Sequence, residues 1–377
     1  MLEKGGNMKT YKDYYGNSAF FMGTIINKLE EVYTRYGYDS IYTPLLEKKS
    51  FDEKQESIFS VVGSDGDQYS LKFDSTLSLK RLIADHDDIV FPFKRYQIQK
   101  SFRKAGRDLN EFYQCDADII KSKTKNSDAE IIQIASEGLN NVGLYDHSIN
   151  INHKKIIDAL NNNKTIDFEE VSNKNIIESI DILLSKELNS DIKEGLSEIK
   201  EIVELLPKET KKKCKLNFDM TEDADYYTGI VFNGVVDTDE PKVLLRGGRY
   251  DELIKDSNNN YLPSVGMAYV LEDVLDVLKV KGKDKKCNCD RIIFYLQDDN
   301  IEIRNEALAR LREKYEVLTV SNEDLSIKEF IDYSKENNAR LIGIIKEEAL
   351  ELYRVEEFDA KFNKKETKTL KYERKED

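Results

Sequence analysis

The chain has 377 residues, of which 40% are hydrophobic and 34% are charged, and its formal net charge is −14. This length is typical of roughly two to three domains. The sequence contains no run of about 18 apolar residues, which a membrane-spanning helix would need. The excess of acidic residues argues against an extensive electropositive surface for nucleic acid. The three histidines and four cysteines show no zinc-ligand spacing and no catalytic motif, so we expect a reduced, cytoplasmic protein without a metal site.

The N-terminal third of the chain predicts two helices and two antiparallel strand pairs. Apolar residues at helical spacing indicate helices over 18–36 and 76–86. Residues 57–74 predict a hairpin that turns at "SDGD" (64–67), because Gly and Asp between alternating segments are typical of turns. Alternating apolar residues predict two longer strands within 94–120, joined by a short basic loop.

The middle of the chain predicts more helices and the rest of a sheet. Ser127 and Glu130 stand three residues apart at the start of a helical pattern, which is the signature of a capping box. Residues 148–160 predict a strand followed by a helix, and residues 162–213, rich in Lys, Glu, Leu and Ile, indicate a helical insertion. Further strands of an antiparallel sheet are predicted at 215–220, 229–236 and 242–248. Residues 263–278 predict a buried strand that runs into a helix and closes this sheet.

The C-terminal part of the chain follows a different pattern. Residues 279–290 are polar and lysine-rich without periodicity, which is typical of a linker. Strand and helix patterns then alternate, which predicts a small parallel α/β domain over 290–377. Within it, residues 349–355 and 360–370 predict a closing hairpin with no final helix. The expected fold class is α+β: an antiparallel sheet with helices over 1–280, followed by the α/β domain.

Six segments, in order, resemble the histidyl-tRNA synthetase family, which has a class II aminoacyl-tRNA synthetase fold. They are "YTPLLE" (42–47), "LKFDSTLSLKRL" (71–82), "KRYQIQKSFRKAGRDLNEFYQCDADII" (94–120), "DYYTGIVF" (225–232), "RGGRYDEL" (246–253) and "SVGMAYVLEDVL" (264–275). The first is similar to the class II motif that builds the dimer interface, so the resemblance implies a homodimer. It also implies that the C-terminal domain is anticodon-binding-like.

The resemblance further implies a pocket for L-histidine. The family holds the ammonium of the ligand with polar acceptors, the imidazole with a carboxylate, and the ring with two tyrosines. The matching residues here are Asp74, Thr76 and Gln114 for the ammonium, Asp118 for the imidazole, and Tyr226 and Tyr227 for the ring. A hydrogen bond to a charged group of this kind contributes about 1.5–3 kcal/mol.

The nucleotide side of the pattern departs from the family. Glu222 stands where the family has an arginine between the histidine carboxylate and the ATP α-phosphate, and Asp273 stands where the third motif has the arginine that holds the triphosphate. At about 4 Å and an effective dielectric constant near 20, unit charges interact by about 4 kcal/mol, so each change of sign is costly. We therefore expect no catalytic residue and no cofactor. Candidate anion or nucleotide contacts are Arg103, Arg107 and Arg249.

A retained amino-acid site beside an altered nucleotide site is typical of a sensor. Within the resemblance, it predicts the regulatory subunit of ATP phosphoribosyltransferase, an allosteric subunit of histidine biosynthesis that partners a short-form catalytic subunit and is not catalytic by itself. Neither a tRNA surface nor a membrane contact is expected. An arginine such as Arg246 or Arg249 has to replace the one lost at Glu222. Two alternatives stay open: a working histidyl-tRNA synthetase, and an inactive paralogue that acts as an adaptor.

Overall fold

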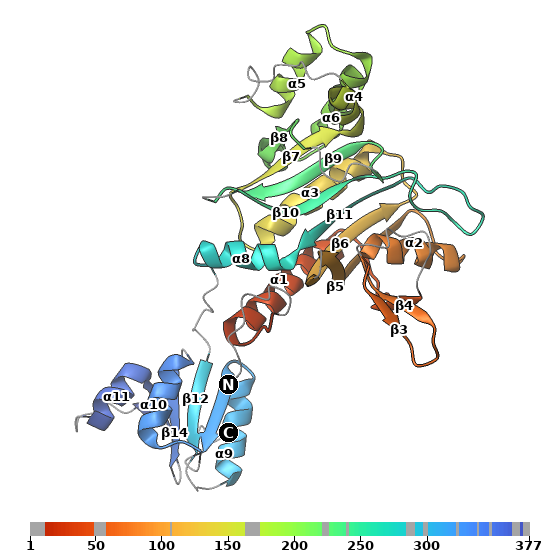
Figure 1. Cartoon of the computed structure of the whole chain (residues 1–377). Coiled ribbons are helices and arrows are strands. Elements are labelled where there is room, and N and C mark those ends of the chain that lie inside the picture. The colour runs from red at the N-terminus through yellow and green to blue at the C-terminus, as the bar shows by residue number, and fades with distance from the viewer. Residues whose placement is uncertain are drawn as a thin grey trace. The chain divides into compact units, whose positions relative to one another are not determined.

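An eight-stranded sheet forms the framework of residues 12–283 (Figure 1). Its strands, in spatial order, are β1 (Asp39–Ser40), β5 (Phe93–Ala105), β6 (Asp108–Ile120), β11 (Ser264–Val270), β10 (Lys242–Arg249), β9 (Ile230–Val236), β7 (His147–His153) and β8 (Cys214–Leu216). Neighbouring strands run antiparallel except at the two edges of the sheet, where β1 runs parallel to β5 and β8 runs parallel to β7. The strand pair predicted within 94–120 is confirmed by β5 and β6.

The computed structural model divides the chain into two compact units, Met1–Asp284 and Lys285–Asp377. It describes residues 12–48, 58–105, 108–162, 174–220, 226–238, 241–283, 291–296, 301–321, 324–337, 339–346, 349–363 and 370–371. Within these ranges, no helix is long and apolar enough to cross a membrane.

One face of the large sheet is covered by helices and forms the main core. The helices are α1 (Gly16–Arg35), α3 (Lys125–Asn141) and α8 (Leu271–Val280). Because side chains alternate along a strand, every second residue of the sheet meets this layer. Buried residues on this face include Tyr96, Ala117, Ile151, Phe232, Met267 and Tyr269. Each large apolar side chain buried on this face contributes about 1.5–3 kcal/mol to stability.

The opposite face of the sheet is partly covered by α2 (Ser75–Asp85). Leu79 and Ile83 of this helix belong to a second buried cluster that includes Val231 and Tyr250 from the large sheet and its flanking segment. A small sheet precedes α2 and has the order β2 (Leu46–Lys48), β4 (Gln68–Leu71), β3 (Ser60–Val62). The antiparallel pairing of β3 with β4 confirms the hairpin predicted over 57–74.

The capping box predicted at the start of α3 is wrong. The N-cap is Thr124, whose hydroxyl accepts a hydrogen bond from the Ser127 backbone at 3.4 Å. Glu130 serves a tertiary contact instead: it accepts hydrogen bonds from the Tyr38 hydroxyl at 2.9 Å and from Lys94 Nζ at 2.8 Å. A local sequence signature was therefore overridden by partners from distant segments.

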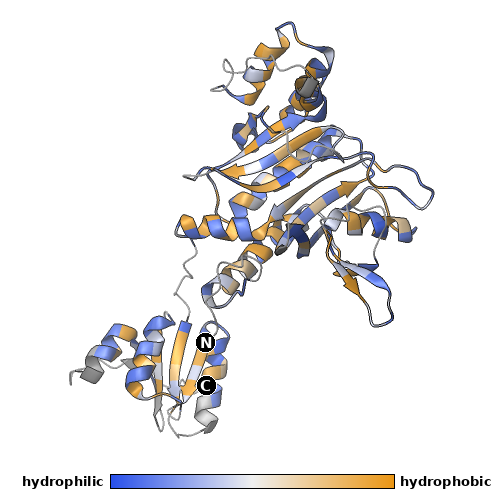
Figure 2. Cartoon of the chain, viewed as in Figure 1, coloured by the Kyte–Doolittle hydropathy of each residue, from blue (hydrophilic) through white to orange (hydrophobic). Residues whose placement is uncertain are grey.

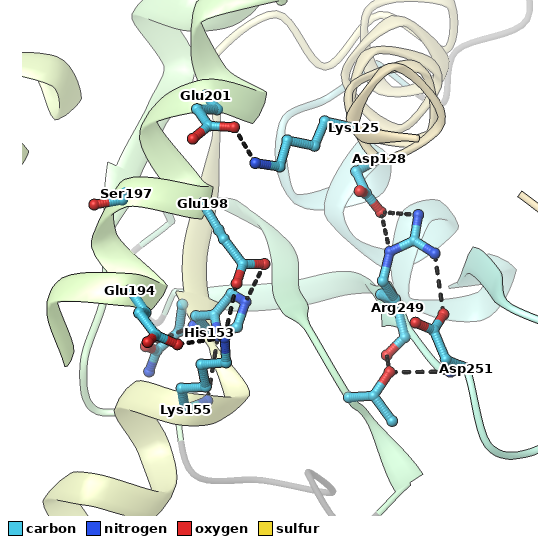
Figure 3. A network of polar contacts seen from close by, with 12 residues as sticks. Lys125, Asp128, His153, Lys155, Glu194, Ser197, Glu198, Glu201, Arg249 and Asp251 are labelled. Carbon is cyan, nitrogen blue, oxygen red and sulfur yellow. Dashed lines mark hydrogen bonds and ion pairs between the residues drawn. The ribbon is translucent and has the colours of Figure 1, made fainter. Parts of the chain in front are cut away.

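The insertion within 162–213 is helical over its described residues. Its elements are α5 (Ile176–Leu184), α6 (Ser190–Glu204) and α7 (Lys208–Lys213), and α4 (Lys154–Asn162) precedes them. Figure 3 shows the polar contacts that attach α6: His153 lies 3.3 Å from Glu198, Lys155 lies 2.9 Å from the same carboxylate, and Lys125 pairs with Glu201. The hydrogen bonds from His153 and Lys155 lower the pKa of Glu198 to about 2, and the bond from His153 has the largest effect.

The second unit has a five-stranded sheet of mixed direction. Its order is β13 (Glu316–Ser321), β12 (Arg291–Leu296), β14 (Leu341–Lys346), β15 (Ala349–Arg354) and β16 (Leu370–Lys371). The parallel pairing of β12 with β13 and β14 confirms the predicted parallel arrangement. Its helices are α9 (Ile301–Arg312), α10 (Ile327–Glu336) and α11 (Val355–Asn363). The predicted closing hairpin is wrong over 355–363, where α11 follows β15 directly and buries Val355 and Phe358 at helical spacing. The antiparallel pairing of Leu352 with Leu370, from β15 to β16, is the part of the hairpin that forms.

The two sheets differ in their hydropathy pattern. Figure 2 shows β12 as hydrophobic over most of its length, whereas β5 and β6 carry hydrophobic and hydrophilic residues in turn. A parallel central strand is buried on both faces, while an antiparallel strand can present one face to polar surroundings. The alternation in the large sheet therefore leaves one of its faces available for a polar site.

Candidate functional site

The strand registers bring polar residues together on the sheet face opposite α1 and α3, which we call the polar face. Directly paired residues have side chains on the same face. Across β5, β6 and β11 the pairs include Arg95↔Asp118, Gln97↔Asp116, Gln99↔Gln114, Asp118↔Gly266 and Asp116↔Ala268. Across β11 and β10 they include Ala268↔Arg246 and Gly266↔Gly248. Two of the sequence-predicted residues, Gln114 and Asp118, thus share one face.

Asp118 lies at the centre of a buried network. Arg95 donates to Asp116 at 2.6 Å and pairs with Asp118, and the Tyr250 hydroxyl donates to the other oxygen of Asp118. Arg95 is 0% exposed and Asp118 is 3% exposed. Burial raises the pKa of Asp118 to about 6, although the charge of Arg95 opposes this shift. A Cβ at Gly266 would overlap the carboxylate, so the backbone of β11 approaches Asp118 as only glycine allows.

The residues predicted for the ligand ammonium lie at the start of α2 and on β6. Asp74 is the N-cap of α2 and accepts a hydrogen bond from the Leu77 backbone at 2.9 Å, and Thr76 lies in the first turn. Burial raises the pKa of Asp74, while that hydrogen bond and the charge of Arg103 oppose the rise. Gln114 is buried and accepts from the Ser101 hydroxyl at 3.0 Å.

Three tyrosines form an aromatic wall next to Asp118. The rings of Tyr226 and Tyr227 lie 4.3 Å apart, and the Tyr226 hydroxyl donates to that of Tyr227 at 2.9 Å. The Tyr226 ring also lies 6.3 Å from Tyr250, which contacts Asp118. A Cβ at Gly248 would lie 2.8 Å from the Tyr227 ring, so this ring lies directly over the backbone of β10. Tyr226 is 43% exposed and lies at the open side of the wall.

The three arginines predicted as anion contacts have different positions. Arg103 is exposed, with its guanidinium 5.1 Å from the Phe73 ring and 5.3 Å from the Phe112 ring. Arg107 lies outside the described residues, as does Glu222. Arg249 points to the opposite face, where its Nε donates to Asp128 at 2.9 Å and its Nη1 pairs with Asp251 at 3.0 Å (Figure 3). Its guanidinium is thus occupied by partners within the protein and lies away from the polar face.

Sequence reasoning missed three charged residues of the polar face and its surroundings. Arg95 and Asp116 belong to the network around Asp118. Lys72 is 1% exposed, and its Nζ donates to Thr43 and to Gln99, each at 2.8 Å. Burial lowers the pKa of Lys72 to about 8. The sequence did hold a signal for Asp116. It lies two positions before the predicted ligand residue Asp118, and residues two apart on a strand share a face.

The charges of this network suit a cationic ligand group. The buried groups are three carboxylates (Asp74, Asp116 and Asp118) and two cations (Lys72 and Arg95), which leaves one negative charge in excess when all are ionised, and the exposed Arg103 lies beside Asp74 at the edge of this network. In addition, Gln97 Oε1 and Asp116 Oδ1 are buried acceptors that have no hydrogen-bond partner among the residues that the structure describes. Buried acceptors are stabilised when a donor reaches them, and a ligand ammonium provides such donors.

The acidic residues at the start of α8 have local partners. Asp273 Oδ1 lies 2.7 Å from Lys242 Nζ. Glu272 accepts hydrogen bonds from the Tyr113 backbone at 3.0 Å and from the Tyr14 hydroxyl at 3.4 Å, and burial raises the pKa of Glu272. Acidic side chains in the first turn also interact favourably with the helix dipole. In the described part of the chain, no group of His, Cys, Asp and Glu could hold a metal ion.

Comparisons with known proteins all lead to one family. A family model described as "Histidyl-tRNA synthetase" matches residues 11–181 and 172–274. The chain is 29% identical over 353 residues to the histidine–tRNA ligase of Treponema denticola, covering 78% of each chain. It is 29% identical over 325 residues to that of Nanoarchaeum equitans, covering 76% of this chain and 78% of the relative.

Two solved structures show the fold. Histidyl-tRNA synthetase from Nostoc sp. PCC 7120 superposes with a TM-score of 0.73 at 21% identity, covering 93% of this chain and 95% of that chain. An ATP phosphoribosyltransferase regulatory subunit/histidyl-tRNA synthetase from Bacillus halodurans C gives a TM-score of 0.70 at 19% identity, covering 92% and 98%. The predicted fold, a class II aminoacyl-tRNA synthetase-like arrangement around an antiparallel-rich sheet, is confirmed.

Proposed function

The chain belongs to the histidyl-tRNA synthetase family, and we propose that it acts there as a non-catalytic regulatory subunit of ATP phosphoribosyltransferase that binds L-histidine. The observation that carries this proposal is a contrast within one domain. The polar face keeps the predicted carboxylates and tyrosines, whereas Asp273, at the third-motif arginine position, is paired with Lys242.

This contrast disfavours adenylation. Formation of an aminoacyl-adenylate needs cations that stabilise the negative charge developing on the phosphates. Asp273 presents a negative charge at this position, and its pairing with Lys242 at 2.7 Å occupies a nearby cation. The chemistry therefore supports recognition of an amino acid without its activation.

Three measurements test the proposal. Calorimetry with L-histidine in the absence of ATP should show binding, and the protein should co-purify with a short-form ATP phosphoribosyltransferase catalytic subunit. Histidine-dependent ATP–pyrophosphate exchange should stay at background. Exchange at the rate of a histidine–tRNA ligase would contradict a non-catalytic role, and histidine binding without co-purification would favour an adaptor of another kind.

A catalytic histidine–tRNA ligase is the second candidate function. Both curated relatives described above carry that name at 29% identity. Arg103 also keeps an exposed cation beside Asp74, held between Phe73 and Phe112. The exchange assay separates the two candidates, because only the ligase forms the adenylate.

We also propose a homodimer formed through residues 42–47. Tyr42, Leu45 and Leu46 are 73%, 39% and 48% exposed, and clustered exposed apolar side chains are typical of an interaction surface. Light scattering should give a dimer, and Leu46→Asp should shift the mass towards the monomer. A monomeric parent at micromolar concentration would contradict this proposal.

A further inference from the structure

The two arginines of the segment 246–249 lie on opposite faces of the sheet. Arg249 pairs with Val265 across β10 and β11 and bonds to Asp128 of α3. Arg246 pairs with Ala268, which in turn pairs with Asp116 of β6, so its side chain belongs to the polar face. Arg246 is exposed, whereas Arg249 is 8% exposed and surrounded by protein partners. Of these two arginines, Arg246 is therefore the one that can meet a ligand on the polar face.

Arg246 and the carboxylates face each other across a floor of small residues. The strand order β6-β11-β10 places Asp116 and Arg246 two strands apart, which is about 10 Å between backbones at the usual strand spacing. Ala268 lies between them, and Gly266 and Gly248 form the adjacent row. Ala268 therefore leaves room in the row between Asp116 and Arg246, and the neighbouring row is bounded by the Asp118 carboxylate over Gly266 and by the Tyr227 ring over Gly248.

This separation of charges matches a free amino acid, which carries an ammonium and a carboxylate. We propose that Arg246 binds the α-carboxylate of the amino acid while the ammonium lies on the side of the carboxylates, an inference that rests on the histidine-binding function proposed above. The planar guanidinium can donate two parallel hydrogen bonds to a carboxylate. Arg103 is less suited to this role, because it lies beside Asp74, where the negative charge repels a second carboxylate.

A pair of ligands isolates the contribution of Arg246. L-histidinol has the same ammonium and imidazole as L-histidine but has a hydroxymethyl group in place of the carboxylate. The parent protein should bind L-histidine more tightly than L-histidinol. Arg246→Gln should lower the affinity for L-histidine by about 10- to 100-fold, the usual range for losing a hydrogen bond to a charged group. The affinity for L-histidinol should stay unchanged. Arg246→Lys should give an intermediate ratio, because lysine keeps the charge but not the fork.

Arg81→Gln is the matched control, because it removes the same charge from an exposed, surface-paired position on α2. It should leave the ratio of the two affinities as in the parent. Retained L-histidinol binding shows that Arg246→Gln is folded. If the ratio of the affinities for L-histidine and L-histidinol is the same in the parent and in Arg246→Gln, the assignment of Arg246 is overturned, while the histidine-binding function is still supported. A parent that binds neither ligand overturns the histidine-binding function and, with it, this inference.

Discussion

Two acidic groups in the first unit have the same chemistry and opposite surroundings. Asp118 on β6 is buried, and its oxygens are engaged by the buried Arg95 and by Tyr250. Asp273 on α8 is partly exposed, and its partner Lys242 is similarly exposed. A buried charge is costly unless it is paired, whereas an exposed ion pair contributes little because water screens it. The comparison shows that burial constrains the charged residues of the polar face, whereas the charge of the side chain at position 273 can be reversed at low cost in stability.

The largest expected effect comes from breaking the buried pair. Arg95→Leu leaves Asp116 and Asp118 without their shared cation, and removing one partner of a buried pair typically destabilises a protein by about 3–5 kcal/mol. Chemical denaturation followed by circular dichroism and tyrosine fluorescence measures this, since the chain has no Trp. Lys242→Met is the matched control and should change the free energy of unfolding by at most about 1 kcal/mol. Equal effects of the two variants would contradict the comparison.

The next effect is a pH dependence. Burial raises the pKa of Asp118 from 3.8 to about 6, so between these values the folded state binds a proton that the unfolded state releases. The contribution of this group to stability is therefore fully present below about pH 4 and is lost as the pH rises through about 6, with a slope of up to about 1.4 kcal/mol per pH unit.

Asp118→Asn removes this titration. The difference in unfolding free energy between the parent and Asp118→Asn should change across this pH window and stay constant above about pH 7. A difference that stays constant from pH 4 to 7 would show that Asp118 titrates at its ordinary pKa.

A third effect concerns the ligand. Asp118→Ala removes the predicted imidazole acceptor and should weaken L-histidine by about 1–3 kcal/mol, or roughly five- to a hundred-fold. Calorimetry at neutral pH measures this, with unfolding of the apo variant as the check on its fold. Equal affinities in the parent and the variant would mean that the imidazole does not meet Asp118.

The smallest effect is expected at α8. Asp273→Arg places a like charge next to Lys242 but should change the free energy of unfolding by no more than about 1 kcal/mol, because both side chains are partly exposed. L-histidine affinity should remain within about twofold of the parent, since the residue makes no contact with the network of Asp118 among the described residues. A larger loss of affinity would place Asp273 in the histidine site.

Much of the fold followed from the sequence because its patterns are local. Period-two alternation predicted β5 and β6, and their short connection predicted antiparallel pairing, which in turn placed Gln114 and Asp118 on one face. The same local logic failed where distant groups competed. Glu130 bonds to Tyr38 and Lys94 instead of capping α3. The segment after β15 forms a helix because Val355 and Phe358 can be buried against the core of the second unit.

The sequence by itself determined the family and the order of the strands along the chain, and it predicted candidate histidine-binding residues, since ordered motifs and alternation are properties of the chain alone. Only the tertiary structure decided that Arg95 neutralises Asp118, and that Arg246 belongs to the polar face while Arg249 points to α3. The physical reason is that alternation along a strand separates two sets of side chains but does not say which set the helices cover. That choice depends on strand register and helix packing, which bring together residues far apart in the chain.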